Sequence, residues 1–189
     1  MKNLLLTISF FVGFQFCTAQ TTYVLAAEEG AKVSVKGNST LHEWEAVASE
    51  IIDHPTEIIT DLKVKSGFED FGFKVGVASL DGGRGASMNK KIKKALIATT
   101  HPYIIFASAE VELLDESVVK SKGALEIAGK SMDVAVDATV SLEDDQLVIS
   151  GSKALKMSDF GIEPPTAMFG QIKTRDEIEV HFEFRYVAK

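Results

Sequence analysis

The chain has 189 residues, a formal net charge of -7 and a single cysteine. This acidity excludes a protein whose main partner is nucleic acid, because phosphate recognition requires a basic surface. It likewise predicts no broad basic face for anionic lipid. About 170 residues follow the N-terminal segment described next, a length that suits one domain with a sizeable core.

The N-terminal segment Met1–Ala19 has the pattern of a secretory signal peptide. Lys2 precedes the apolar run Leu4–Phe16, which is too short for a stable membrane span, and small residues follow at the cleavage point. We expect cleavage after residue 19, export to the periplasm or the cell exterior, and one domain over residues 20–189. The only cysteine would leave with the signal, so that domain would contain no disulfide. An uncleaved anchor is the alternative.

Alternation of apolar and polar residues predicts β-strands in the first half, because successive strand side chains point to opposite faces. In Phe71–Ser79, the apolar residues alternate with glycines and a lysine, and the glycines permit the bending that a barrel wall requires. The predicted strands here are Thr22–Ala26, Lys32–Lys36, Leu41–Ser49, Ile58–Val64 and Phe71–Ser79.

The period changes after the glycine-rich loop Asp81–Gly85. Met88, Ile92 and Leu96 recur at four-residue spacing, and lysines cover the remaining surface. This pattern predicts an amphipathic helix of about three turns with Ser87 as its N-cap. It is the only helix of any length expected in the mature chain.

The strand pattern resumes in the second half, and its clearest case is the last segment, Glu177–Val187. Apolar residues there alternate with Glu, His and Arg, so that one face is apolar and the other charged. A long loop, Ser158–Gln171, precedes it and carries large apolar residues, so it should lie against something. The other predicted strands are Tyr103–Leu113, Val118–Ala128, Ser131–Leu142 and Gln146–Met157, with a hairpin around Gly129-Lys130.

Eight or nine sequential strands joined by short turns predict an all-β fold, an antiparallel meander closed into a barrel to remove its edges. A barrel of about eight strands has room for side chains or for one small ligand. A β-sandwich is the competing architecture, and periodicity does not separate the two.

Several segments resemble the YceI-like lipid-binding family, in particular its Bacteroidetes members. The matching segments are Ser39–Trp44 (STLHEW), Met88–Leu96, His101–Phe106 (HPYIIF), Gly123–Lys130 (GALEIAGK), Lys156–Ile162 (KMSDFGI) and Pro164–Gly170 (PPTAMFG). Together they cover nearly the whole mature chain, and their order and spacing are more specific than any one of them.

The resemblance implies an exported, lipocalin-like, antiparallel eight-stranded barrel with one inserted short helix and a long apolar C-terminal loop. It also implies that the lumen holds a long-chain amphiphile such as a polyisoprenoid quinone, a prenyl phosphate or a fatty amide. The chain departs from the family at Asp81–Gly85, where many relatives carry acidic and His residues. A head-group contact from this loop is therefore not carried over.

Residues that face the lumen or its mouth are the candidate ligand contacts. Aromatic and Met side chains suit a flexible chain because they are large or adaptable. The predicted ligand-binding residues are Trp44, Phe71, Phe73, Val75, Met88, Ile92, Leu96, Val134, Val136, Phe160, Met168, Phe169, Phe182 and Phe184. The competing interpretation is that these side chains pack as solid core, or that the helix and loop residues plug one end of the barrel.

The polar residues show no pattern of a metal or catalytic site. The four histidines fall on separate segments without partners at metal-ligand spacing, so no metal site is expected. His42 and Glu43 are the acid/base candidates if the protein is a lipid-modifying enzyme. The cations Lys156, Lys173, Arg175 and Arg185 either meet an anionic head group or lie on a solvated exterior.

The sequence thus favours a non-enzymatic binding protein over a lipid-modifying enzyme or a filled-barrel structural or stress-response module. The expected partner is a small-molecule lipid, with no nucleic acid and no integral membrane span in the mature chain. No cofactor is expected apart from a bound lipid or isoprenoid. Edge strands or the apolar loop could pair two copies as a homodimer, and no pattern decides this.

Overall fold

One curled sheet dominates the structure, a computed structural model that describes residues 21–26, 30–54, 57–60, 72–114 and 117–189. Its strands are β1 Thr21–Leu25, β2 Ala31–Ser39, β3 Glu43–Ala48, β4 Ile51–His54, β5 Glu57–Thr60, β6 Gly72–Gly76, β7 Leu80–Asp81, β8 Tyr103–Leu113, β9 Val118–Ile127, β10 Lys130–Glu143, β11 Gln146–Lys156, β12 Thr166–Ala167 and β13 Ile172–Ala188. The helix α1 spans Ala86–Ala95, and three short 3₁₀ turns are η1 Val77–Ser79, η2 Met157–Phe160 and η3 Met168–Gly170. The expected signal peptide and Phe71 lie outside the described residues.

The predicted alternation of the last strand is confirmed in β13. Phe182, Phe184 and Tyr186 are buried, whereas Glu183 and Arg185 between them remain partly exposed. The buried side chains join one continuous core that is shared by most of the other strands. The apolar face of β13 therefore points inward and its charged face points outward, as a period of two requires.

A bent strand closes the sheet. Neighbouring strands pair antiparallel in the order β4-β6-β8-β9-β10-β11-β13-β2-β3-β7. β3 leads almost directly into β4, and the two pair with opposite ends of this order, β2 and β6. At the corner, the Glu50 N–H donates to Ser79 Oγ at 3.0 Å, and the Gly76 N–H donates to the Glu50 oxygen at 3.0 Å. The result is a curled, barrel-like wall and not a sandwich of two separate sheets.

The predicted all-β architecture is confirmed, but the strand count is higher than eight. Thirteen strands occur in the described part of the chain. The barrel wall has eight strands if β3 and β4 are counted as one bent strand. The other four strands, β1, β5, β7 and β12, are short additions to this wall. β7 and β12 have two residues each, which is too short for periodicity to reveal them. β1 and β5 overlap the predicted strands Thr22–Ala26 and Ile58–Val64, and residues 61–64 lie outside the described residues.

The helix forms where its four-residue spacing predicts, but the predicted N-cap was wrong. Gly85 caps α1 with φ 78°, and Ser87 lies inside the first turn. A positive φ at the entry position favours glycine, because a side chain there would clash with the backbone. The helix has no fully buried residue, so it is an element laid across one end of the barrel.

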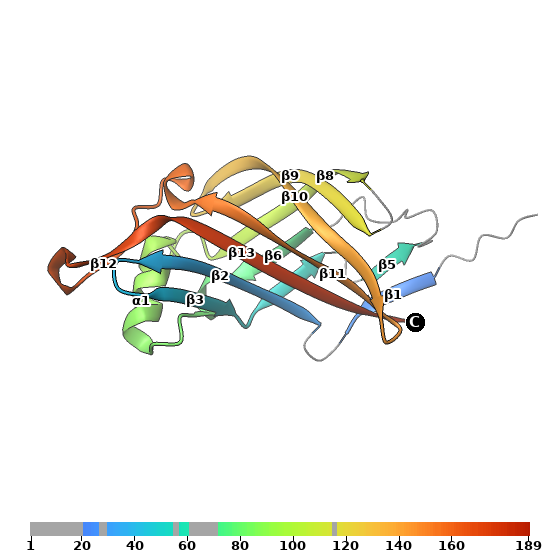
Figure 1. The fold of residues 1–189 in the computed structure, drawn as a ribbon, viewed down its shortest axis with the longest axis horizontal. Helices are drawn as coiled ribbons and strands as arrows, with labels where there is room; N and C mark the ends of the chain where they lie inside the picture. The colour runs from blue at the N-terminus through green and yellow to red at the C-terminus, as the bar shows by residue number, and fades with distance from the viewer. Residues whose placement is uncertain (1–20, 27–29, 55–56, 61–71, 115–116) are drawn as a thin grey trace, which may run out of the picture.

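Figure 1 shows α1 and β12 at one end of the barrel and the C-terminus at the other. We call the α1 end the mouth. The turn between β2 and β3 also lies there, because the Thr40 N–H donates to the Lys173 oxygen at 2.9 Å, just after η3. The loop predicted to lie against the barrel does so in part: Phe160 and Ile162 are 3% and 6% exposed.

Candidate functional site

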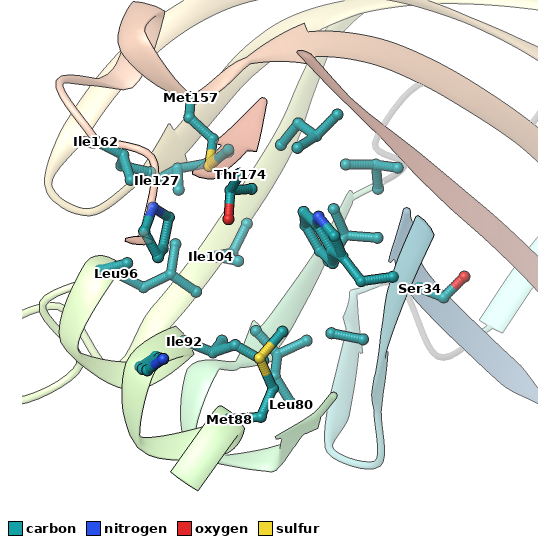
Figure 2. Close-up of a pocket in the computed structure, with 18 of the residues that line it drawn as sticks. Ser34, Leu80, Met88, Ile92, Leu96, Ile104, Ile127, Met157, Ile162 and Thr174 are labelled. Atoms are coloured by element: carbon teal, nitrogen blue, oxygen red, sulfur yellow. The ribbon is translucent and has the colours of Figure 1, made fainter. Parts of the chain in front are cut away.

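The half of the barrel nearest the mouth contains a partly open cavity of about 260 Å³. Its walls come from β2, β3 and β13 on one side and from β6, β8 and β9 on the other. Figure 2 shows Met88 and Ile92 of α1, and Leu96 just after it, bordering a space that Met157 and Ile162 border from another side. Ligand pockets span about 300–1,000 Å³. At about 260 Å³ this cavity lies just below that range.

The wall is apolar because the inward positions of the surrounding strands are apolar. The register aligns Val35 of β2 with Ala46 of β3 and with Val180 of β13, and all three line the cavity. The same alternation brings Ile104 of β8, and Leu125 and Ile127 of β9, to the opposite wall. A surface of this kind binds through the area that it removes from water, so it suits a hydrocarbon chain.

Trp44 is the main polar feature of the wall. Its ring stands over Gly37, where an added Cβ would come within 2.4 Å of a ring carbon, so this close approach requires glycine. The indole Nε1 is buried and has no hydrogen-bond partner among the described residues. A buried donor without an acceptor is costly. Because this nitrogen is closed even to a water-sized group, a ligand oxygen in the cavity could pair with it only if the ring turns.

A few other polar side chains line the cavity near its mouth. Ser39 and Thr174 pair across β2 and β13, and His42 follows in the β2–β3 turn. Arg84 lies before α1 and Lys91 within it. None of the ion pairs found among the described residues involves either cation. The mouth of the cavity is thus more polar and more cationic than its interior.

The four cations predicted from the sequence lie elsewhere. Lys156, Lys173, Arg175 and Arg185 do not line the cavity. Arg185 donates to Glu183 at 2.8 Å and to Glu143 at 3.3 Å. Arg84, by contrast, belongs to the loop that departs from the family pattern, so this loop does contribute a polar group to the site. Only the folded position of α1 and the preceding loop reveals this.

Two carboxylates hold the mouth segments in place. Asp176 of β13 accepts the Ser158 N–H at 2.8 Å and also the Ser158 hydroxyl, which fixes η2 and its buried Met157 and Phe160. Asp81 accepts the Gly83 N–H and the Asn89 amide, each at 3.0 Å. The loop before α1 and the turn over the cavity are therefore both attached to the barrel through an aspartate.

These attachments predict a loss of order at the mouth in acid. Hydrogen bonds from the Ser158 hydroxyl and N–H lower the pKa of Asp176 below its ordinary 3.8, and those from Gly83 and Asn89 lower the pKa of Asp81. Because both pKa values fall on folding, the two ionised carboxylates stabilise the fold at any pH above their ordinary pKa. This stabilisation is lost as the pH drops through the lowered pKa values. We expect Asp176→Ala to reproduce the loss for η2 at neutral pH, measured as faster amide exchange at Ser158.

Glu177→Ala is the matched control for that experiment, because Glu177 is the exposed neighbour of Asp176 on β13. It should leave the exchange of Ser158 unchanged. Equal protection of Ser158 in both variants would contradict a role for Asp176 in holding η2.

The inner end of the cavity is closed by aromatic rings. Phe73 lies 5.3 Å from Phe184, 5.8 Å from Phe106 and 6.0 Å from Phe182, measured between ring centroids. Beyond these rings a second cavity of about 60 Å³ continues along the barrel, and Phe73 lines both. The lumen is thus hollow at the mouth and largely filled farther in, and Phe73, together with Leu125 and Val180, lies between the two spaces.

The residues predicted to contact ligand, apart from Phe71, fall into four groups. Those that line the main cavity are Trp44, Phe73, Val75, Met88, Ile92, Leu96 and Phe160. Val136 and Phe182 line the second cavity instead, while Val134 and Phe184 line neither and pack with the core. Met168 and Phe169 point outward, with exposures of 64% and 109%. Ligand contact by the cavity-lining residues remains a prediction.

The outward position of Met168 and Phe169 has a backbone cause. Both residues have positive φ, 50° and 56°, and these values turn the chain away from the cavity at η3. An apolar composition alone therefore did not distinguish the buried start of this loop from its exposed end.

Several cavity residues were missed, including Leu80, Ile104, Leu125, Ile127, Met157 and Ile162. Leu125 and Ile127 lie two residues apart in a predicted strand with Glu126 between them, and this alternation could have identified them. Ile104 lies in a strand with little period, and Ile162 lies in a loop. For these two, only the closure of the barrel decides which side chains face the cavity.

The acid/base candidates do not form a side-chain pair. His42 Nδ1 lies 3.0 Å from the backbone oxygen of Glu43, and Glu43 is exposed on β3. Ser39 Oγ donates to the backbone oxygen of His42 at 2.8 Å. These contacts shape the β2–β3 turn. No group of three His, Cys, Asp or Glu side chains is arranged to hold a metal ion within the described ranges.

No helix in the part of the chain that the structure describes is long and apolar enough to span a membrane. A search of the curated proteins finds no match. Solved structures with the same fold do exist. One is BcnA of Burkholderia cenocepacia, with 21% identity, a TM-score of 0.69, and coverage of 82% of this chain and 95% of that one.

Two further structures share the fold. The YCEI protein of Campylobacter jejuni is 20% identical over 76% of this chain and 84% of its own, with a TM-score of 0.61. A polyisoprenoid binding domain from Saccharophagus degradans is 12% identical over 90% of this chain and 100% of its own, with a TM-score of 0.63. The model of the YceI-like domain matches residues 15–186. The chain therefore belongs to the YceI-like family.

Proposed function

We propose that this protein is an exported, non-enzymatic carrier that holds the chain of an amphipathic lipid in its main cavity. The observation that carries the proposal is the partly open cavity of about 260 Å³, whose walls are apolar and whose mouth is polar. The proposal includes a periplasmic or extracellular location and membership of the Bacteroidetes-type subgroup. The ligand classes are a polyisoprenoid quinone, a prenyl phosphate and a fatty amide.

The energetics suit such a ligand. A chain that buries about 300 Å² of apolar surface gains about 7 kcal/mol at 25 cal/mol per Å². The loss of translational and conformational freedom offsets part of this gain. Affinity can therefore come from the chain, while polar groups near the mouth select the head. The printed name of the Saccharophagus degradans relative, a polyisoprenoid binding domain, supports the same ligand class.

Two measurements test the carrier proposal. Organic extraction of the purified protein followed by mass spectrometry should release a lipid. Trp44 is the only tryptophan of the chain and lines the cavity, so its emission should shift when a prenol, a quinone or a fatty amide is titrated. A protein that carries no lipid and whose emission stays constant with all three ligands would end the proposal.

The unpaired indole N–H predicts a preference for ligands that contain an acceptor. Trp44→Phe keeps an aromatic ring but removes the donor at Nε1. We expect about tenfold weaker binding of a fatty amide, because leaving its oxygen unpaired costs about 1–2 kcal/mol. Binding of an alkane of the same length should stay unchanged, and the alkane is therefore the control. Calorimetry measures both, and equal losses for the two ligands would show that only packing changed.

A further inference from the structure

The positive charge of this acidic protein is concentrated at the mouth. Residues 82–109 contain Arg84 and four lysines and no Asp or Glu, so this segment carries +5. Because the whole chain carries -7, the remaining residues carry -12. All four lysines are on α1, at positions 90, 91, 93 and 94. The acidic net charge predicted no broad basic face, and it does not reveal this local segment, because net charge averages over the whole chain.

Exposed apolar side chains lie beside this basic segment. Phe169 is 109% exposed, Leu41 67%, Met168 64% and Ile97 48%. Leu41 and η3 adjoin, because Thr40 accepts the Lys173 N–H at 3.2 Å and donates to the Gln171 oxygen at 3.4 Å. Ile97 follows the last turn of α1. Figure 1 places α1 and the β12 end of the barrel together, opposite the C-terminus.

Three of these four exposed residues have an unfavourable backbone conformation. Ile97, Met168 and Phe169 have φ values of 51°, 50° and 56°. Positive φ is unfavourable for large side chains, above all β-branched ones, and such strain tends to mark functional positions. Here these conformations occur at apolar side chains that are about half to fully exposed, so packing within the chain compensates for the strain only in part.

We propose that the mouth is a docking surface for an anionic lipid bilayer. Leu41, Ile97, Met168 and Phe169 enter the interfacial region, and the lysines of α1 contact the lipid phosphates. Apolar insertion combined with basic residues is the usual basis of peripheral membrane binding. Docking in this way would place the opening of the cavity against the bilayer, so that an apolar chain could pass between them without crossing water.

A bilayer fits this surface better than a protein partner. Phe169 protrudes fully, so a protein would need a matching pocket, whereas lipid adapts to any protruding side chain. The same end also has the exposed carboxylates Glu43 and Glu163 and the exposed cations Lys173 and Arg175. The segment with the highest density of positive charge is the loop before α1 together with α1. The surface therefore combines a basic strip with separate apolar protrusions around an apolar opening.

Vesicle flotation tests the proposal. The processed protein, with one N-terminus for all variants, is mixed with vesicles of phosphatidylethanolamine and phosphatidylglycerol or of phosphatidylcholine alone. We expect binding to the anionic vesicles that weakens as salt is added. The triple variant Lys90→Gln, Lys93→Gln, Lys94→Gln should bind about 100-fold more weakly, and Met168→Ser with Phe169→Ser at least about tenfold more weakly.

Matched controls come from the opposite end of the barrel. Lys32→Gln, Lys120→Gln and Lys189→Gln remove the same charge, and Leu142→Ser removes an apolar residue that is 51% exposed. Neither should change vesicle binding by more than about twofold. Phe169→Gly should weaken binding yet raise the melting temperature, because glycine accepts positive φ. If Phe169 had only a structural role, this substitution would lower the melting temperature instead.

The outcomes separate this proposal from the carrier function. None of the substituted residues lines the main cavity, so every variant should still shift Trp44 emission with a soluble ligand. Equal binding to anionic and neutral vesicles, or wild-type binding by both mouth variants, would overturn the docking surface while leaving the carrier function intact.

Discussion

Ala95→Trp is expected to weaken the binding of a long-chain ligand by about 100- to 1,000-fold. Ala95 is the last residue of α1 and lines the main cavity. An indole there would displace about 100–150 Å² of ligand surface, a loss of about 2.5–4 kcal/mol. The fold should tolerate the larger side chain, because α1 contains no fully buried residue and can shift outward.

Ala86→Trp is the matched control, since it introduces the same side chain at the exposed first residue of the same helix. Ligand affinity is measured by calorimetry and folding by circular dichroism. The control should bind like the wild type. If Ala95→Trp also bound with wild-type affinity while folded, the ligand would have to lie outside the main cavity.

Phe73→Ala is expected to destabilise the protein and to lengthen the ligand that it accepts. Removing a ring that contacts three others should cost about 3–5 kcal/mol, which lowers the melting temperature of a chain of this size by about 6–20 °C. Because Phe73 is the largest of the three residues that line both cavities, its loss should join them into one longer channel. The chain length of the tightest-binding ligand in a homologous series should therefore increase.

Phe184→Ala separates the two effects. Phe184 belongs to the same aromatic cluster and has 0% exposure, but it lines neither cavity. It should lower the melting temperature by a similar amount without changing the preferred chain length. If both variants shifted that preference equally, general loosening of the core would explain the change and Phe73 would not act as a partition.

Both predictions depend on an asymmetry of the barrel. The aromatic side chains of β6, β8 and β13 meet in the inner half and fill most of it, whereas mainly aliphatic side chains, with Trp44 and Phe160 among them, surround the mouth half. A ring buries far more surface than a valine, so the position of the rings along the strands sets the depth of the cavity. The filled-barrel alternative thus describes the inner half, and the hollow barrel describes the half beside α1.

The amino-acid sequence by itself determined the strands, the helix and the facing of most side chains. Periodicity is a local property, so the inward row of β13, and Met88, Ile92 and Leu96 on α1, could be predicted without the fold. The same holds for Trp44, whose place in an alternating segment already put it on the inner face. Seven of the predicted contacts accordingly line the main cavity.

Only the tertiary structure decided which inward residues meet empty space and which meet each other. Val134 and Phe184 alternate as regularly as Val75, yet they pack with the core, because hollowness depends on how far apart opposite walls lie after the barrel closes. The positions of Arg84 and Lys91 at the cavity, and of Phe169 in solvent, likewise follow from how α1 and η3 sit on the barrel. Contacts between segments far apart in the chain leave no local pattern in the sequence, so only the fold determines which residues form the site.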